Sequence, residues 1–259
     1  KTPVIDLVEI GAGGGSIGHV DPGGAMAVGP ESAGADPGPA CYARGGDRPT
    51  LTDANLLLGR LNPGYFLGGE VELNVGLAKE ATRQHLARHL GMTVTEAANG
   101  MIEIANANMT GALQLVSVQK GIDPRSFVLV AFGGSGPLYA VALAQALQMN
   151  TVLVPPSPGV TSALGLLVTD LRHDYVRTYI ALTDQLDLAF MRRTYREFEK
   201  SSSEILLREG VRRKDIRFIR EADMRYRGQS YELRVPLPEG PLDKKKIPTL
   251  NDAFFAAHE

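Results

Sequence analysis

A run of glycines between two apolar segments is the first feature of this sequence with an evident chemical use. Gly133, Gly134, Ser135, Gly136 and Pro137 follow the apolar run 127–132 and precede an Ala/Leu-rich segment. Glycines at a strand-to-helix turn let the main chain come close to a ligand, because they carry no Cβ. The helix that follows offers unpaired N–H groups to a phosphate or a ribose edge. We therefore predict that this turn contacts a nucleotide, with a tight packing turn as the alternative.

A second glycine run lies near the start of the chain, at Gly13, Gly14, Gly15 and Ser16. Successive main-chain N–H groups in such a loop can form a concave nest for an anion. The loop is therefore predicted to line the phosphate or substrate side of a site. The alternative is a flexible connection with no ligand.

The polar stretch 29–55 is a long loop rich in Gly, Pro and Ala, and such loops usually serve a site. Asp53 and Asn55 could orient a substrate or hold Mg²⁺ through water, which makes them the candidate catalytic residues. The alternative is a helix cap, with Thr52 or Asp53 as the N-cap. Cys41 is equally consistent with an inert and with a reactive thiol.

The five histidines, at positions 19, 85, 89, 173 and 258, do not form a metal motif. His85 and His89 have the spacing of a metal-binding pair, but no Glu completes an H-E-x-x-H sequence. We expect them to be surface residues, and any metal ligands remain unknown at this stage.

Hydrophobic patterns indicate the elements that carry these residues. A strand is predicted over 4–10, and helices over 74–90 and over 95–120 with Thr95 as N-cap. Residues 126–169 contain no charged residue and no His, but glycine and proline clusters divide them into short pieces. The order strand, glycine turn, helix, strand predicts a βαβ unit whose parallel strands are covered on both faces. A further apolar helix is predicted over 160–168, and a membrane span is disfavoured.

The last third of the chain has a different composition, with 34 of the 56 charged residues in 170–259. A strand over 172–180, a helix over 188–209, a hairpin of 216–226 with 231–237 and a helix from Thr249 are predicted there. We therefore expect two domains: an α/β domain over 1–170 and an α+β domain over 171–259.

Overall composition narrows the class of protein. The 259 residues carry a net charge of −2 and no Trp, which argues against nucleic acid or a charged membrane surface as a partner. A single cysteine is typical of a reducing compartment, so a cytoplasmic location is expected. The start at Lys1 suggests a piece of a longer chain.

Six ordered motifs resemble the hydantoinase/oxoprolinase family, which includes ATP-dependent N-methylhydantoinase, oxoprolinase and the large subunits of acetone and acetophenone carboxylases. They are GAGGGSI at 11–17, VGPESAGADPGPACY at 28–42, TLTDANLLLGRL at 50–61, FLGG at 66–69, KGIDPRSFVLVAFGGSGPLYA at 120–140 and PPSPGVTSALGLL at 155–167. The resemblance covers nearly all of 4–170 and continues more weakly to about 238. Family members often carry Ala and His where this chain has Ser135 and Tyr139.

The resemblance implies the second lobe of an actin-like, ribonuclease-H-like ATPase fold with a C-terminal α+β extension. Its two phosphate loops would lie before Lys1, and this piece alone would be inactive. ATP and Mg²⁺ are the implied cofactors, and a cyclic amide activated by phosphorylation is the implied substrate. A second hydantoinase-type subunit or a homo-oligomer is the expected partner. The alternatives are a subunit of an ATP-dependent ketone carboxylase and a non-catalytic module that docks a partner.

Overall fold

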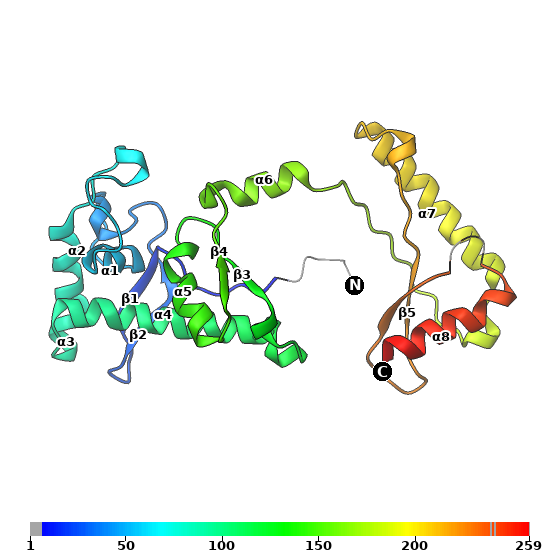
Figure 1. Cartoon of the computed structure of the whole chain (residues 1–259), viewed down its shortest axis with the longest axis horizontal. Coiled ribbons are helices and arrows are strands. Elements are labelled where there is room, and N and C mark those ends of the chain that lie inside the picture. Colours follow the sequence, from blue (N-terminus) through cyan, green and yellow to red (C-terminus); the bar gives the residue numbers. More distant parts are fainter. Residues whose placement is uncertain (1–6, 239, 241, 259) are drawn as a thin grey trace. The chain divides into compact units, whose positions relative to one another are not determined.

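The computed structural model describes residues 7–238, 240 and 242–258, and its chain divides into two compact units. The first unit ends at Thr169 and the second begins at Asp170 (Figure 1). Each sheet in the described part of the chain has two strands. Helices and strands both occur in each unit, as expected of a chain of mixed class.

The first unit begins with an antiparallel hairpin of β1 (Ser16–Val20) and β2 (Met26–Ser32). Its turn is closed by Asp21, whose Oδ1 accepts a hydrogen bond from the Ala25 N–H at 2.9 Å. The strand predicted over 4–10 is wrong for residues 7–10, which are irregular, and its residues 4–6 lie outside the described residues.

Helices enclose the core of the first unit. α1 (Leu51–Leu57) packs on α4 (Val94–Val116), and α2 (Val75–Thr82) continues through a π-helical turn at Arg83–Ala87 into α3 (Arg88–Leu90). Leu51, Leu86, Met101 and Ile102 are at most 1% exposed at the centre of this core. Both predicted helices are confirmed, but the N-cap of α4 is Thr93 and not Thr95. Thr93 forms a capping box with Glu96, and Thr95 has no Glu or Gln three residues later.

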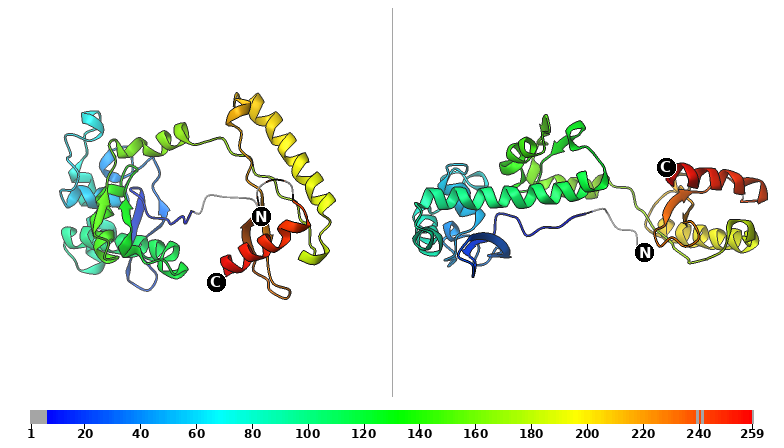
Figure 2. Two further views of the ribbon diagram at one scale, coloured as in Figure 1. Left: turned by 45° about the vertical axis from the view of Figure 1, so that its right-hand side comes forward. Right: turned by 90° about the horizontal axis from the view of Figure 1, so that it is seen from below.

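The predicted βαβ unit is present as β3 (Val128–Val130), α5 (Gly136–Ala146) and β4 (Thr151–Leu153), with parallel strands. It lies on the opposite side of α4 from the β1–β2 hairpin (Figure 2, right). The expectation of strands covered on both faces is wrong for the chain as described, because Val128, Val130 and Leu153 are each nearly half exposed. α6 (Thr161–Val168) buries none of its residues. No described helix is long and apolar enough to cross a membrane.

The second unit packs α7 (Leu188–Arg208) and α8 (Ile247–His258) with the hairpin of β5 (Glu221–Met224) and β6 (Leu233–Pro236). Val235, Leu250 and Phe254 form its core. The helices and the hairpin were predicted, with strands shorter than expected. The strand predicted over 172–180 is wrong, since this segment is irregular.

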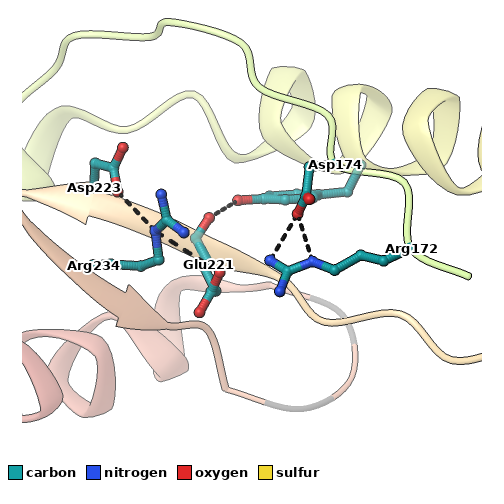
Figure 3. A network of polar contacts seen from close by, with 6 residues as sticks. Arg172, Asp174, Glu221, Asp223 and Arg234 are labelled. Atoms are coloured by element: carbon teal, nitrogen blue, oxygen red, sulfur yellow. Dashed lines mark hydrogen bonds and ion pairs between the residues drawn. The ribbon is translucent and has the colours of Figure 1, made fainter. Parts of the chain in front are cut away.

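Polar contacts hold that irregular segment and β5 beside α7 (Figure 3). Arg172 pairs with Asp174 at 2.8 Å. The Tyr195 hydroxyl on α7 donates to the main-chain oxygen of Glu221 at 2.8 Å, and Arg234 on β6 lies 3.4 Å from Asp223. The irregular segment is itself tied to α7 by Arg177, which pairs with Glu197 at 3.0 Å.

Candidate functional site

The predicted nucleotide turn lies where the sequence places it, between β3 and α5. Gly133 has a positive φ of 84°, which favours glycine, and its N–H donates to the Pro158 carbonyl at 2.8 Å. Ser135 is the N-cap of α5, but its side chain makes no capping hydrogen bond. The N–H groups of Gly134 and Ser135 have no hydrogen-bond partner among the described residues. The turn therefore presents free donors at the start of an 11-residue helix.

Packing does not account for the other glycines of the turn. A Cβ built on Gly134 or on Gly136 would meet no heavy atom within 4 Å, and neither residue has a positive φ. Within the described chain, glycine is thus required at these two positions neither by conformation nor by crowding. This openness is what a closely approaching ligand needs, and it weighs against a turn built only for packing.

The first glycine loop is docked onto the start of α1. The N–H and hydroxyl of Thr52 both donate to the Gly14 carbonyl at 2.9 Å. Ser16 closes the loop, since its Oγ accepts from the Gly13 N–H at 2.9 Å and donates to the Gly11 carbonyl at 3.2 Å. The Ser16 hydroxyl and the Gly13 N–H therefore satisfy each other. The N–H groups of Gly14 and Gly15 are left without a partner among the described residues.

Asp53 is fully buried, and its carboxylate is occupied inside the fold. It accepts hydrogen bonds from the N–H groups of Ala40, Cys41 and Thr50 at 3.2, 2.8 and 2.8 Å, and from the Thr50 hydroxyl at 2.8 Å. Thr50 is the N-cap of α1, with Asp53 at the third helical position of a capping box. Asp53 therefore takes part in a helix cap, as the alternative to a catalytic role expected. The N-cap itself is Thr50, and not Thr52 or Asp53. This geometry does not favour Asp53 as a catalytic or magnesium-binding group.

Asn55 joins α1 to the helix that follows the nucleotide turn. Its Nδ2 donates to the Leu51 carbonyl and to the Tyr139 hydroxyl on α5, both at 2.8 Å. Burial raises the pKa of Tyr139, so the phenol is neutral at ordinary pH. The Oδ1 atom of Asn55 is buried and has no partner within the described chain. Tyr139 is the site residue that sequence analysis missed, since it was noted only for its departure from the family pattern.

Burial also decides the state of the single cysteine, which the sequence left open between a reactive and an inert thiol. Cys41 is fully buried, and desolvation raises the pKa of its thiol well above the ordinary range, with the Asp53 carboxylate as a second cause. The alternative of an inert thiol therefore holds. Within residues 7–238, 240 and 242–258, no cluster of three or more His, Cys, Asp or Glu side chains could hold a metal ion.

An α/β unit with an open glycine turn before a helix, and with a second glycine loop docked on the start of α1, offers main-chain donors suited to binding phosphates. A sequence model of the hydantoinase/oxoprolinase family matches residues 1–175. The chain therefore belongs to this family.

Two relatives with similar sequences illustrate the membership. The chain is 45% identical to an uncharacterized protein of Methanocaldococcus jannaschii, over 100% of this chain and 36% of that protein. It is 36% identical to the caprolactamase subunit alpha of Pseudomonas jessenii, over 99% of this chain and 37% of that protein.

The crystal structure of the ATP-dependent caprolactamase from Pseudomonas jessenii aligns with a TM-score of 0.75, at 37% identity, over 96% of this chain and 36% of that chain. A nucleotide-free structure of acetone carboxylase aligns with a TM-score of 0.76, at 30% identity, over 96% of this chain and 36% of that chain. The chain thus spans just over a third of the length of these relatives.

Proposed function

We propose that this chain is part of an ATP-dependent enzyme that hydrolyses a cyclic amide, and that Gly133, Gly134, Ser135, Gly136 and Pro137 contact the adenosine side of ATP. The open, donor-rich turn before α5 carries the proposal. The names of the relatives support it: caprolactam is a cyclic amide, and the caprolactamase is named as ATP-dependent. We assign the fold to the second lobe of an actin-like ATPase.

ATP would supply a phosphoryl group to the amide oxygen, which would activate the carbonyl carbon for attack by water. The ring C–N bond would then break, and phosphate would be released. The described residues contribute binding and positioning. The N–H groups of Gly134 and Ser135 would donate to the nucleotide, and those of Gly14 and Gly15 to the phosphate or substrate side. Asn55 would fix α5 through Tyr139, which makes it a positioning residue. The described residues provide no cluster for Mg²⁺, so we derive no step through the ion.

The nucleotide contact is tested by Gly134→Val in a full-length polypeptide that contains this segment. The side chain enters open space in the protein but would occupy the volume of the ligand, so ATP affinity should fall at least about tenfold while the melting temperature is unchanged. Gly111→Val is the matched control, because its Cβ also meets no atom within 4 Å and it lies on α4, outside the turn. Unchanged ATP affinity for Gly134→Val would remove the turn from the site.

The substrate class is tested by phosphate release from the same polypeptide. Cyclic amides such as caprolactam, oxoproline and hydantoin should stimulate release. Stimulation only by bicarbonate with acetone or an aryl ketone would instead identify a ketone carboxylase, the class of the structurally similar acetone carboxylase.

A second candidate function, docking of a partner, is favoured by the exposed apolar surface of the first unit. Leu166 and Leu167 on α6 are each 83% exposed, and Val168 is 73% exposed. Three of the matched relatives are named as subunits: caprolactamase alpha, acetophenone carboxylase gamma and acetone carboxylase beta. We propose that a further subunit or a second copy covers part of this surface. Size-exclusion chromatography with light scattering distinguishes a monomer from an oligomer.

A further inference from the structure

The π-helical turn and β1 enclose a hollow that the proposed function does not use. Its volume is about 380 Å³, at the lower end of the range typical of ligand pockets. It is lined by Gly18, His19 and Val20 of β1, by Arg48, and by His85 and His89 of the helical segment. Three histidines and an arginine from three separate segments therefore line one open hollow.

Local main-chain geometry explains this convergence. Ile17 forms an antiparallel bridge with Thr50, and the Gly18 N–H donates to the Pro49 carbonyl at 2.8 Å. Continuing this register sets His19 opposite Arg48. On the helical side, the Arg88 N–H donates to the carbonyl of Arg83, five residues earlier. Such a π turn advances by less rotation per residue than an α-helix, which brings residues four apart, such as His85 and His89, closer to one line along the helix.

Close packing holds the two walls together. A Cβ on Gly18 would lie 2.6 Å from Met101 Cε and 3.1 Å from Leu86 Cδ1, so β1 lies directly against the π turn. Leu86, which lies between His85 and His89 in the sequence, is fully buried. π turns interrupting α-helices often mark functional sites, because their extra residue has a cost in stability.

The hollow combines imidazoles that have no partner among the described residues with an arginine that is paired with Glu31. In the described part of the chain, none of the three imidazoles makes a hydrogen bond or ion pair. Arg48 gives one N–H from each terminal nitrogen to Glu31, at 2.7 Å, and keeps its remaining N–H groups. Among the described residues, these side chains do not form a group that could hold a metal ion. Neutral or protonated imidazole N–H groups with a guanidinium are donors for an oxyanion.

We propose that this hollow, defined by His19, Arg48, His85 and His89, binds a small tetrahedral oxyanion of the sulfate or phosphate type. Its affinity rises as the pH falls, because histidine gains charge between pH 8 and pH 5. Among the surrounding charges, Glu31 is paired with Arg48 and Glu80 with Arg83. Glu96 and Glu103 accept hydrogen bonds from neutral groups on α4 or its cap. Asp47 and Arg88 also lie on the lining segments.

The test is a sulfate titration of the purified chain, followed by NMR of the histidine ring signals at constant ionic strength. Sulfate keeps its charge between pH 6 and pH 8, so a change in affinity reports on the protein. We expect saturable shifts of the His19, His85 and His89 rings at pH 6, and affinity at least about tenfold weaker at pH 8. His85→Gln and His89→Gln should each weaken binding about threefold to tenfold. His173→Gln, which removes a histidine from the second unit, should change nothing.

Several results would overturn the site. They are shifts that grow linearly or include His173, equal affinity for acetate or chloride, and an affinity that does not change with pH. Sulfate shifts confined to the amides of Gly134 and Ser135 would instead place the anion at the proposed nucleotide turn. Because the wild-type pH dependence is measured without any substitution, the proposal stays testable even if a variant fails to fold.

Discussion

The two halves of the first unit bury their apolar side chains to different extents, although the more exposed half, 126–169, contains no charged residue. In the half that contains β1, α1 and α4, Leu51, Leu86 and Met101 are fully buried around one core. In the half that contains β3, β4 and α6, the exposed valines and leucines of these three elements are between about half and more than four-fifths exposed. Only α5 of that half contributes buried residues to the core, Tyr139 and Leu143. The second half has the local structure of a βαβ unit but lacks a covering layer within the described residues.

The two glycine loops differ in the same way. Added Cβ atoms on Gly14 and Gly15 would lie 2.8 Å from Thr52 Oγ1 and 2.7 Å from Ser32 Oγ. On Gly134 and Gly136 they would meet nothing within 4 Å. The first loop is therefore constrained by its own fold, whereas the second is open to whatever approaches it. Glycine is thus required by crowding at Gly14 and Gly15, whose N–H groups are still without a partner among the described residues, but not at Gly134 and Gly136.

The largest effect is expected from Asp53→Ala, which breaks the packed half. Removing the carboxylate leaves the buried N–H groups of Ala40, Cys41 and Thr50 without acceptors, so the free energy of unfolding should fall by about 3–5 kcal/mol. Urea denaturation followed by circular dichroism measures this. Asp123→Ala is the control, since Asp123 also accepts hydrogen bonds but is exposed. Normal stability with lost ATP turnover in a full-length polypeptide would restore the catalytic interpretation.

A smaller effect separates the two glycine loops. Gly14→Ala should cost about 1–3 kcal/mol, because the new methyl group collides with the Thr52 hydroxyl that is bonded to the Gly14 carbonyl. Gly134→Ala should change the free energy of unfolding by less than about 0.5 kcal/mol. Thermal melts of the two variants compare their losses of stability. Equal losses would mean that the second loop is also constrained by contacts within the fold.

Tyr139→Phe tests the link between the halves and should cost about 1–2 kcal/mol. The Nδ2 of Asn55 loses one of its two acceptors, while its Oδ1 is already without a partner in the described chain. Tyr65→Phe, at an exposed tyrosine, is the control and should be neutral. Denaturation midpoints report both. No difference between the two variants would show that the Asn55–Tyr139 hydrogen bond contributes nothing net.

Local patterns predicted most of the elements, and they also contained the signal that identifies two N-caps which the predictions misplaced. The helix starts were placed at Thr95 and at Thr52 or Asp53, whereas the caps are Thr93 and Thr50. In both cases the true cap is the Thr with an acidic residue three positions later, which is the capping-box pattern. A stricter use of that rule would have found both caps and would have assigned Asp53 its structural role.

Other features had no local signal. Asn55 and Tyr139 are 84 residues apart, so their hydrogen bond depends on how α1 and α5 pack against α4. The π turn at Arg83–Ala87 interrupts a sequence with ordinary helical periodicity. Apolar composition predicted burial for 126–169, but composition cannot say whether the covering surface belongs to the same stretch of chain.

The smallest effect on stability is expected at the exposed helix α6. Replacing Leu166 and Leu167 together by Ser should change the free energy of unfolding by less than about 1 kcal/mol, because both side chains are 83% exposed. The same change at Leu51, which is fully buried, should cost about 2–5 kcal/mol or prevent folding. If α6 docks a partner or a second copy, the double variant should also lower self-association or subunit capture, measured by light scattering. A large loss of stability in the double variant would show that α6 is packed in solution. The contrast between the two halves of the first unit would then disappear.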